Sequence, residues 1–237
     1  GAAALGLAGL EEGYHSLLPS FAALLREMHL AEARGGQGGG FALLFRSFGD
    51  DVEDVVAEYN ALCEGRHPLA AAGGFPRMDG SDGCRDRRIA GEQLLSFRRP
   101  EGADGMRGVE LHAGLHAQGG LVATGWGEVH AAIQARLDER PALAVRDDFP
   151  SWSACGESDR AGKPHVVAPG ALSIFLDDNV EPDHAHIVDV RAPDGTPVSF
   201  EDAMGRHIVR VDPVQAILRE DYFIEVLEGC RRRQPGV

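Results

Sequence analysis

Residues 173–180 read Ser-Ile-Phe-Leu-Asp-Asp-Asn-Val, an apolar run that leads directly into two carboxylates and an amide. A short apolar run bounded by polar residues predicts a buried strand. In open α/β sheets, ligands bind beyond the carboxyl ends of the strands, so Asp177 and Asp178 are placed to handle a cation or a phosphate. A divalent ion is the usual reason for two neighbouring carboxylates to be tolerated. The local alternative is an acidic turn, because Asp and Asn favour turns.

The alternation of apolar patterns along the 237 residues predicts an α/β fold. Apolar residues spaced three and four apart predict helices over residues 14–34, 52–63, 125–140 and 214–229. Short apolar runs predict strands at residues 41–45, 142–149, 172–180, 187–190 and 208–211. We expect a Rossmann-like three-layer sandwich with a mostly parallel sheet, formed by residues 1–237 as a single domain.

Residues 65–124 are rich in Gly, Arg and Asp and have only weak patterning. Long irregular segments inside compact domains are usually functional loops or insertions. We therefore expect an insertion with one or two short strands, including a hairpin over residues 108–124 that turns at Gly119-Gly120. The glycine run at residues 35–40 lacks the Gly-Lys-Ser/Thr ending of a phosphate loop, so it is interpreted as a flexible connector.

Composition excludes several classes of partner. The formal net charge of -14 argues against nucleic acid, because contacts to its phosphates need clustered Lys and Arg. No apolar run approaches the length of a membrane-spanning helix. The four cysteines form no Cys-x-x-Cys pair, which gives no indication of a zinc site and favours reduced thiols in a cytoplasmic protein.

Three polar motifs follow one another in a recognisable order: Ser47 after an apolar strand, Lys163 in Gly162-Lys163-Pro164, and Asp177-Asp178 after another apolar strand. This order resembles the haloacid dehalogenase-like (HAD-like) superfamily. The segments FRSFGDD, RDDFPSW, GKP and FLDDN…IVDVR are similar to a eukaryotic branch of it. The resemblance implies that Ser47 and Lys163 bind phosphoryl oxygens, with Lys163 stabilising negative charge, and that Asp177 and Asp178 bind Mg²⁺. These residue types suit those roles, because hydroxyl and ammonium groups bind phosphate oxygens and carboxylates bind Mg²⁺.

One part of the superfamily pattern is not found. The resemblance implies a nucleophilic Asp in an Asp-x-Asp motif that follows a central strand ahead of Ser47, and residues 1–13 contain no Asp. Either the chain begins after that motif and its N-terminal strand is missing, or the protein lacks it. Asp147-Asp148 comes late in the chain and is expected to end a neighbouring strand. There it could border the ligand-binding cleft at the carboxyl ends of the strands, beside a packed Trp152.

Three functional hypotheses remain at this point. The first is a magnesium-dependent phosphohydrolase that acts on a phosphorylated small molecule, and the second is a non-catalytic binding protein of the same fold. The third is a metal-dependent hydrolase that uses His184 and His186, which share a strand face at alternate positions but lack a third ligand in sequence. Ser47 could instead cap the following helix, and Lys163 could be a solvated charge in a polar loop.

Overall fold

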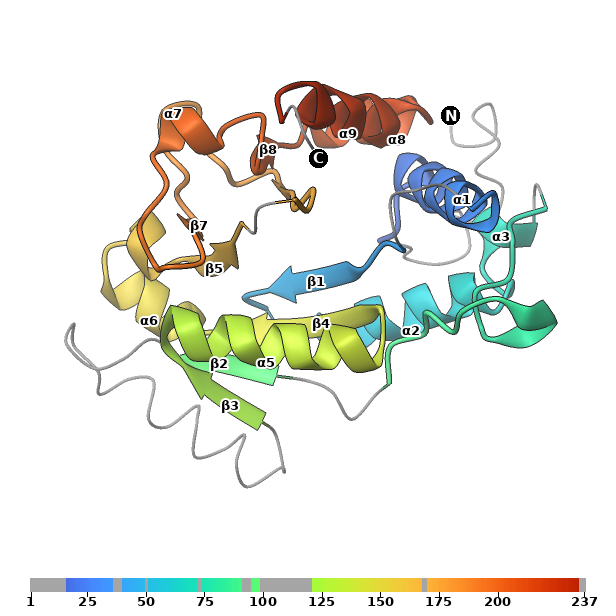
Figure 1. Ribbon diagram of the computed structural model, residues 1–237, viewed down its shortest axis with the longest axis horizontal. Helices are drawn as coiled ribbons and strands as arrows, with labels where there is room; N and C mark the ends of the chain where they lie inside the picture. The colour runs from blue at the N-terminus through green and yellow to red at the C-terminus, as the bar shows by residue number, and fades with distance from the viewer. Residues whose placement is uncertain are drawn as a thin grey trace.

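The computed structural model describes residues 16–35, 40–49, 51–71, 74–90, 95–98, 121–167 and 170–234. Helices and strands alternate along much of this part of the chain (Figure 1). The strands are β1 (Leu43–Ser47), β2 (Leu95–Arg98), β3 (Leu121–Thr124), β4 (Ala142–Asp147), β5 (Lys163–Val166), β6 (Phe175–Asp177), β7 (Val188–Arg191) and β8 (Ile208–Arg210). The helices are α1 (Pro19–Ala33), α2 (Val52–Cys63), α3 (Pro68–Ala71), α5 (Gly125–Glu139), α6 (Phe149–Ala154), α7 (Phe200–Ala203), α8 (Pro213–Leu218) and α9 (Tyr222–Arg232), with 3-10 turns η2 (Ser81–Gly83) and η3 (Asp159–Ala161).

Every pairing between these named strands is parallel. This confirms the prediction of an α/β protein with parallel strands. The described strands form three sheets, a 4-stranded sheet in the order β1-β4-β2-β3 and two 2-stranded sheets, β5-β7 and β6-β8. Among the described strands, β1 therefore pairs only with β4 and β6 only with β8.

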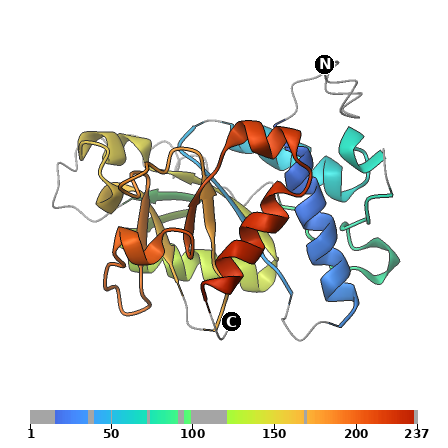
Figure 2. The same cartoon turned by 90° about the horizontal axis from the view of Figure 1, so that it is seen from above.

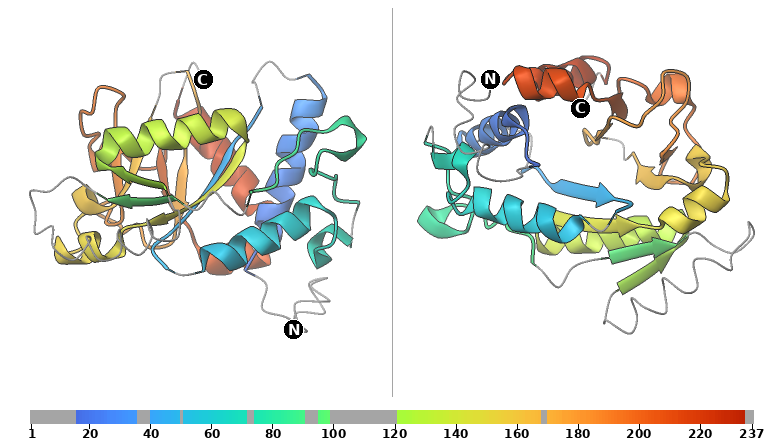
Figure 3. Two further views of the ribbon diagram at one scale, coloured as in Figure 1. Left: turned by 90° about the horizontal axis from the view of Figure 1, so that it is seen from below. Right: turned by 180° about the vertical axis from the view of Figure 1, so that it is seen from behind.

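Helices cover both faces of the 4-stranded sheet. Successive side chains of β4 point to opposite faces, so β4 contacts the helices on both sides. Ala142 and Ala144 belong to the cluster that contains residues of α1 and α2. Leu143 and Val145 pack with residues of α5 instead, and Figure 3 shows α5 lying across the strands. All four of these β4 residues have 0% exposure, so β4 is the buried centre of the sheet.

A third cluster joins distant parts of the chain. Leu24 of α1 packs with Ala216 of α8 and Phe223 of α9, and Figure 2 shows α1 and α9 side by side. The buried Ser20 hydroxyl donates a hydrogen bond of 2.5 Å to the carbonyl oxygen of Ala216. A fourth cluster surrounds β7 and includes Trp152, Val188 and Ile208.

Two of the four predicted helices match the sequence prediction closely. Helix α2 covers residues 52–63 and α5 covers residues 125–139, as expected. Helix α1 begins only at Pro19, which is its first residue and suits that position because proline has no N–H to leave unpaired. The single final helix predicted over residues 214–229 is wrong. Arg219 has extended backbone angles (φ -118, ψ 113) and begins the break of residues 219–221 between α8 and α9.

The region from 65 to 124 contributes strands to the main sheet. Strand β2 pairs with β4 on one side and with β3 on the other. The hairpin predicted over residues 108–124 falls largely outside the described residues; its described part is β3, which runs parallel to β2. Most of the glycine run at 35–40 is also outside them. The described helices include none with the length and the hydropathy of a membrane-spanning segment.

The strand predicted at residues 172–180 is shorter and less buried than expected. Strand β6 contains three residues, and all of them are only partly buried. The five residues of β1 are also partly buried throughout. Both strands lie at an edge of their described sheets. Each therefore has a neighbouring strand on one side only, whereas β4 has one on both sides.

Candidate functional site

The side chain of Lys163 contacts Asp177 and the backbone of the strand that ends in Ser47. Its Nζ lies 3.4 Å from the carbonyl oxygen of Arg46, the residue before Ser47, and 3.3 Å from Oδ2 of Asp177. Ser47 ends β1 and Asp177 ends β6, so Lys163 joins the carboxyl ends of two strands from separate sheets. The site is therefore assembled from segments more than a hundred residues apart.

Lys163 is a buried strand residue, and this corrects the expectation of a solvated charge in a polar loop. It is the first residue of β5 and is 5% exposed. Its Nζ lies 4.8 Å from the ring centroid of Phe48 and 5.7 Å from that of Phe175. A buried ammonium is costly unless it is paired, and the Asp177 carboxylate, the Arg46 carbonyl and the two ring faces provide that pairing.

Lys163 is also the only lysine in the sequence, which has 23 Lys and Arg residues in total. Arginine supplies every other cationic side chain of that set. An ammonium is a compact point charge with three donors, whereas a guanidinium is a wide planar fork. Lysine suits this position between two rings and a carboxylate better than arginine does.

The Asp177 carboxylate is engaged on both oxygens. Oδ1 accepts a hydrogen bond of 2.9 Å from the Asn179 N–H, and Oδ2 faces Lys163. The neighbouring Asp178 is exposed. Mg²⁺ is commonly held by one or two carboxylates, with water and phosphate oxygens in its other positions, and Asp177 and Asp178 are the carboxylates at this strand end.

A metal that needs three or more protein ligands does not fit the described residues. No group of at least three His, Cys, Asp or Glu side chains is arranged there to hold an ion. The rings of His184 and His186 are in contact, with centroids 5.3 Å apart. His186 lies in a tight turn with φ 53, and the Trp152 Nε1–H donates a hydrogen bond of 3.2 Å to its carbonyl. The pair therefore has the geometry of a polar turn before β7.

Ser47 does not cap α2, which corrects one of its two predicted roles. The N-cap residue of α2 is Asp51. The Ser47 hydroxyl donates a hydrogen bond of 2.5 Å to Oδ1 of Asp51 and accepts one of 2.9 Å from the Gly49 N–H. The hydroxyl thus closes the turn between β1 and α2, and it stands one residue from the carbonyl that Lys163 contacts.

Arg46 is a site residue that the sequence analysis missed. Its Nε donates to Oδ2 of Asp147 at 2.8 Å, its Nη2 donates to Oδ1, and its Nη1 donates to the Pro164 carbonyl. The side chains of Arg46 and Asp147 are 2% and 3% exposed. Asp147 is consequently held in a buried ion pair and does not rim a cleft. The sequence did contain an indication of this pair. Arg46 directly follows the apolar run of residues 41–45, and a buried arginine needs a carboxylate partner such as Asp147 at the end of another apolar run.

The remaining residues of the predicted rim are buried as well. Asp148 is 7% exposed, and Trp152 is 7% exposed and packed, as expected. The Trp152 ring stacks on Phe48 with centroids 4.9 Å apart and an interplanar angle of 21°. One wall of the site is therefore aromatic.

His165 lies two residues after Lys163 on β5, and its ring centroid is 5.8 Å from that of Phe175. Its Nε2 is buried and has no hydrogen-bond partner among the described residues. Burial, followed by the positive charge of Arg46, lowers the pKa of His165 to about 3. The imidazole is therefore neutral at physiological pH.

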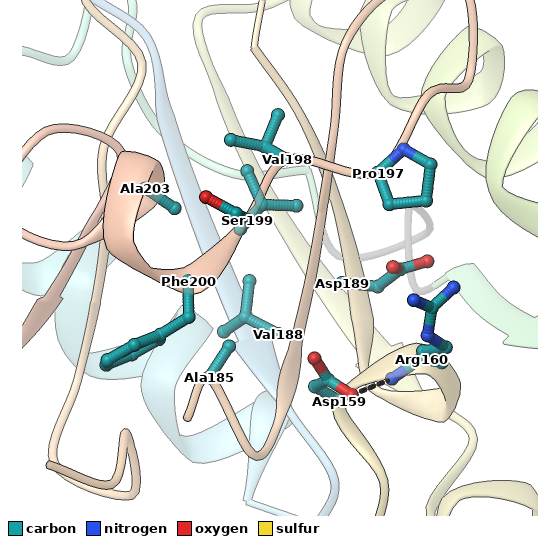
Figure 4. A pocket seen from close by; sticks show the side chains of 11 residues that line it. Asp159, Arg160, Ala185, Val188, Asp189, Pro197, Val198, Ser199, Phe200 and Ala203 are labelled. Atoms are coloured by element: carbon teal, nitrogen blue, oxygen red, sulfur yellow. Dashed lines mark hydrogen bonds between the residues drawn. The ribbon is translucent and has the colours of Figure 1, made fainter. Parts of the chain in front are cut away.

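A separate cavity of about 300 Å³ lies beside β7 and does not include Ser47, Lys163 or Asp177. Figure 4 shows its apolar side chains, such as Val188 and Phe200, with Asp159 and Arg160 at one side. The contacts of Lys163 with Arg46 and Asp177 therefore lie outside this cavity.

Comparisons of the chain with protein-family models, with curated proteins and with solved structures give no match. The chemistry of the site itself therefore carries the functional argument.

Proposed function

We propose that the chain is a HAD-like protein of phosphohydrolase type, with a Rossmann-like arrangement, that binds a phosphorylated small molecule together with Mg²⁺. The binding site would be the meeting point of the carboxyl ends of β1 and β6. Its residues would be Ser47, Lys163, Asp177 and Asp178.

The observation that carries this proposal is the position of the Lys163 ammonium between Arg46 and Asp177. The sequence order of the motifs does not require them to meet, yet a single side chain contacts the ends of two strands. A cation fixed among rings and backbone is preorganised to stabilise a phosphoryl group, because it needs little reorganisation when charge develops. The choice of lysine in a chain whose other such cations are arginines is consistent with a dedicated role.

Each side chain would have its own role in binding. Lys163 would balance charge on the phosphoryl oxygens, and the Ser47 hydroxyl would turn from Asp51 to donate a hydrogen bond to one of them. Asp177 and Asp178 would hold Mg²⁺, which neutralises phosphate charge when bound. The resemblance assigns the nucleophile to an aspartate ahead of Ser47, and the Arg46-bound carboxylate of Asp147 is not placed to replace it.

A non-catalytic binding protein of the same fold is the second candidate. It is favoured by the polar groups already being satisfied within the site: Lys163 by Asp177, and the Ser47 hydroxyl by Asp51. Such a set could serve mainly to join the β1 and β6 sheets.

The single lysine makes a direct binding test practical. Protein labelled with ¹⁵N-lysine has one labelled residue, so its amide and Nζ signals report on Lys163 alone. We expect inorganic phosphate to shift these signals saturably, and more tightly with Mg²⁺. Asp177→Asn should weaken the magnesium dependence, whereas Asp138→Asn, an exposed carboxylate on α5, should not.

Two further readouts separate the candidates. Signals that phosphate leaves unmoved, with and without Mg²⁺, would overturn the phosphate site. Hydrolysis of a generic phosphate ester that is abolished by Lys163→Arg would identify a phosphohydrolase, because the arginine fork cannot occupy the ammonium position. Phosphate binding without hydrolysis would fit both candidates, because the nucleophile that the resemblance implies is not found in residues 1–13.

A further inference from the structure

Phe149 places an exposed aromatic ring at the edge of the sheet where Ser47 ends β1. It is the first residue of α6 and follows the carboxyl end of β4, which pairs in parallel with β1. Its exposure is 45%. Among the described residues, the other exposed large hydrophobic side chains are Val214, Ile217 and Leu218, and all three lie on α8. Phe149 is therefore the exposed ring at this edge.

Two further rings hold Phe149 in position. Its centroid lies 5.9 Å from that of Phe48, at an interplanar angle of 68°, and 5.9 Å from that of Trp152, at 50°. Phe48 and Trp152 stack on each other, and Trp152 is anchored through its Nε1–H to the His186 carbonyl. A ring that is already oriented by its neighbours loses little conformational freedom when a ligand stacks on it.

The same aromatic cluster contacts the candidate phosphate-binding group. Phe48 has the Lys163 Nζ 4.8 Å from its centroid and the Phe149 ring 5.9 Å from it. Phe48 is thus the shared neighbour of the buried ammonium and the exposed ring. A small molecule with a phosphate beside Lys163 and a planar group a short distance away could reach Phe149.

We propose that Phe149 is a stacking platform for a planar aromatic ring, and that this site prefers phosphate esters that carry such a ring over alkyl phosphates. This specificity rests on the proposed function, because Lys163 must hold the phosphate. Aryl phosphates and nucleoside monophosphates share the required chemistry and differ in the linker between phosphate and ring.

The test compares three ligands on the ¹⁵N-lysine-labelled chain with Mg²⁺: ethyl phosphate, phenyl phosphate and uridine 5′-monophosphate. The Lys163 signals give a Kd for each. At least one ring-bearing ester should bind about three- to tenfold more tightly than ethyl phosphate, the range expected for one aromatic pair. A preference for phenyl phosphate would indicate a ring joined directly to the phosphate, and a preference for the nucleotide a ring held through a sugar.

Variants of Phe149 then assign the preference to this ring. Phe149→Leu keeps an apolar side chain but removes the ring, so the tighter Kd should rise to that of ethyl phosphate, whose own Kd stays unchanged. Phe149→Tyr should retain the preference. Ile217→Ala, an exposed apolar residue on α8, should leave all three affinities unchanged. Circular dichroism and the Tm check that each variant is folded.

The outcomes distinguish the platform from the phosphate site. Equal Kd values for the three ligands, or a ring preference that survives in Phe149→Leu, would overturn the stacking role of Phe149 and leave the phosphate site intact. Lys163 signals that none of the ligands shifts would overturn both.

Discussion

His165 should make the stability of the protein fall as the solution becomes mildly acidic. Its pKa is about 3 in the folded protein, chiefly because burial disfavours the imidazolium. In the unfolded chain the pKa should return to about 6.5. Below that pH the unfolded chain takes up a proton that the folded protein does not. Folding is therefore progressively disfavoured as the pH falls from about 6.5 towards the folded-state pKa.

The size of the effect follows from the pKa difference. Each pH unit between the two pKa values changes the free energy of unfolding by about 1.4 kcal/mol. Between pH 7 and pH 5, His165 should therefore cost about 2 kcal/mol of stability. The positive charge of Arg46 and the nearby His130 and His207 act in the same direction, because each disfavours a second positive charge at His165.

Urea unfolding at pH 7 and pH 5, followed by far-ultraviolet circular dichroism, measures this loss. His165→Gln removes the titrating group, and any constant change in stability cancels in the difference between the two pH values. The wild type should lose about 2 kcal/mol more than this variant over that interval. His184→Gln, at an exposed position, is the matched control and should behave like the wild type. Equal pH dependence in wild type and His165→Gln would refute the reasoning.

Two other substitutions test the framework that positions the site. Asp147→Asn leaves the buried Arg46 guanidinium without its charge partner, so urea unfolding should show a loss of about 3–5 kcal/mol. A loss below about 1 kcal/mol would show that the pair is solvent-screened. Gly162→Ala should cost about 1–3 kcal/mol, because a Cβ there would overlap the carbonyl of Ile187, the residue before the paired strand β7. Gly127→Ala on α5 meets no atom within 4 Å and should be neutral or stabilising by about 1 kcal/mol, so a similar loss in both glycine variants would contradict the steric explanation.

Local sequence patterns were sufficient for much of the secondary structure. Residues 52–63 and 125–139 are helical because their apolar side chains recur with the helical period. Ser199 and Asp212 cap helices, each accepting a hydrogen bond of 3.1 Å from a backbone N–H three residues ahead. The parallel α/β arrangement also follows from the alternation of these patterns.

The same patterns could not give the burial or the partners of the polar residues. Lys163 stands in a polar stretch, yet it is buried, because its partners Arg46 and Asp177 come from strands that are remote in sequence. The Arg46–Asp147 pair likewise depends on β1 and β4 being neighbours. Strands β6 and β4 both begin with apolar residues, yet β6 is less buried. The sequence could not predict this difference, because a run of apolar residues does not specify which segments cover the strand.

The sequence alone determined the types and the order of the side chains that we propose as phosphate and magnesium ligands: Ser47, Lys163, then Asp177-Asp178. Only the tertiary structure decided that Lys163 contacts the ends of both β1 and β6, that Asp147 is taken by Arg46, and that Phe149 remains exposed beside them. The physical reason is that residue type and spacing set the chemistry and the local backbone, whereas the desolvation, pairing and exposure of a side chain depend on packing between segments far apart in the chain.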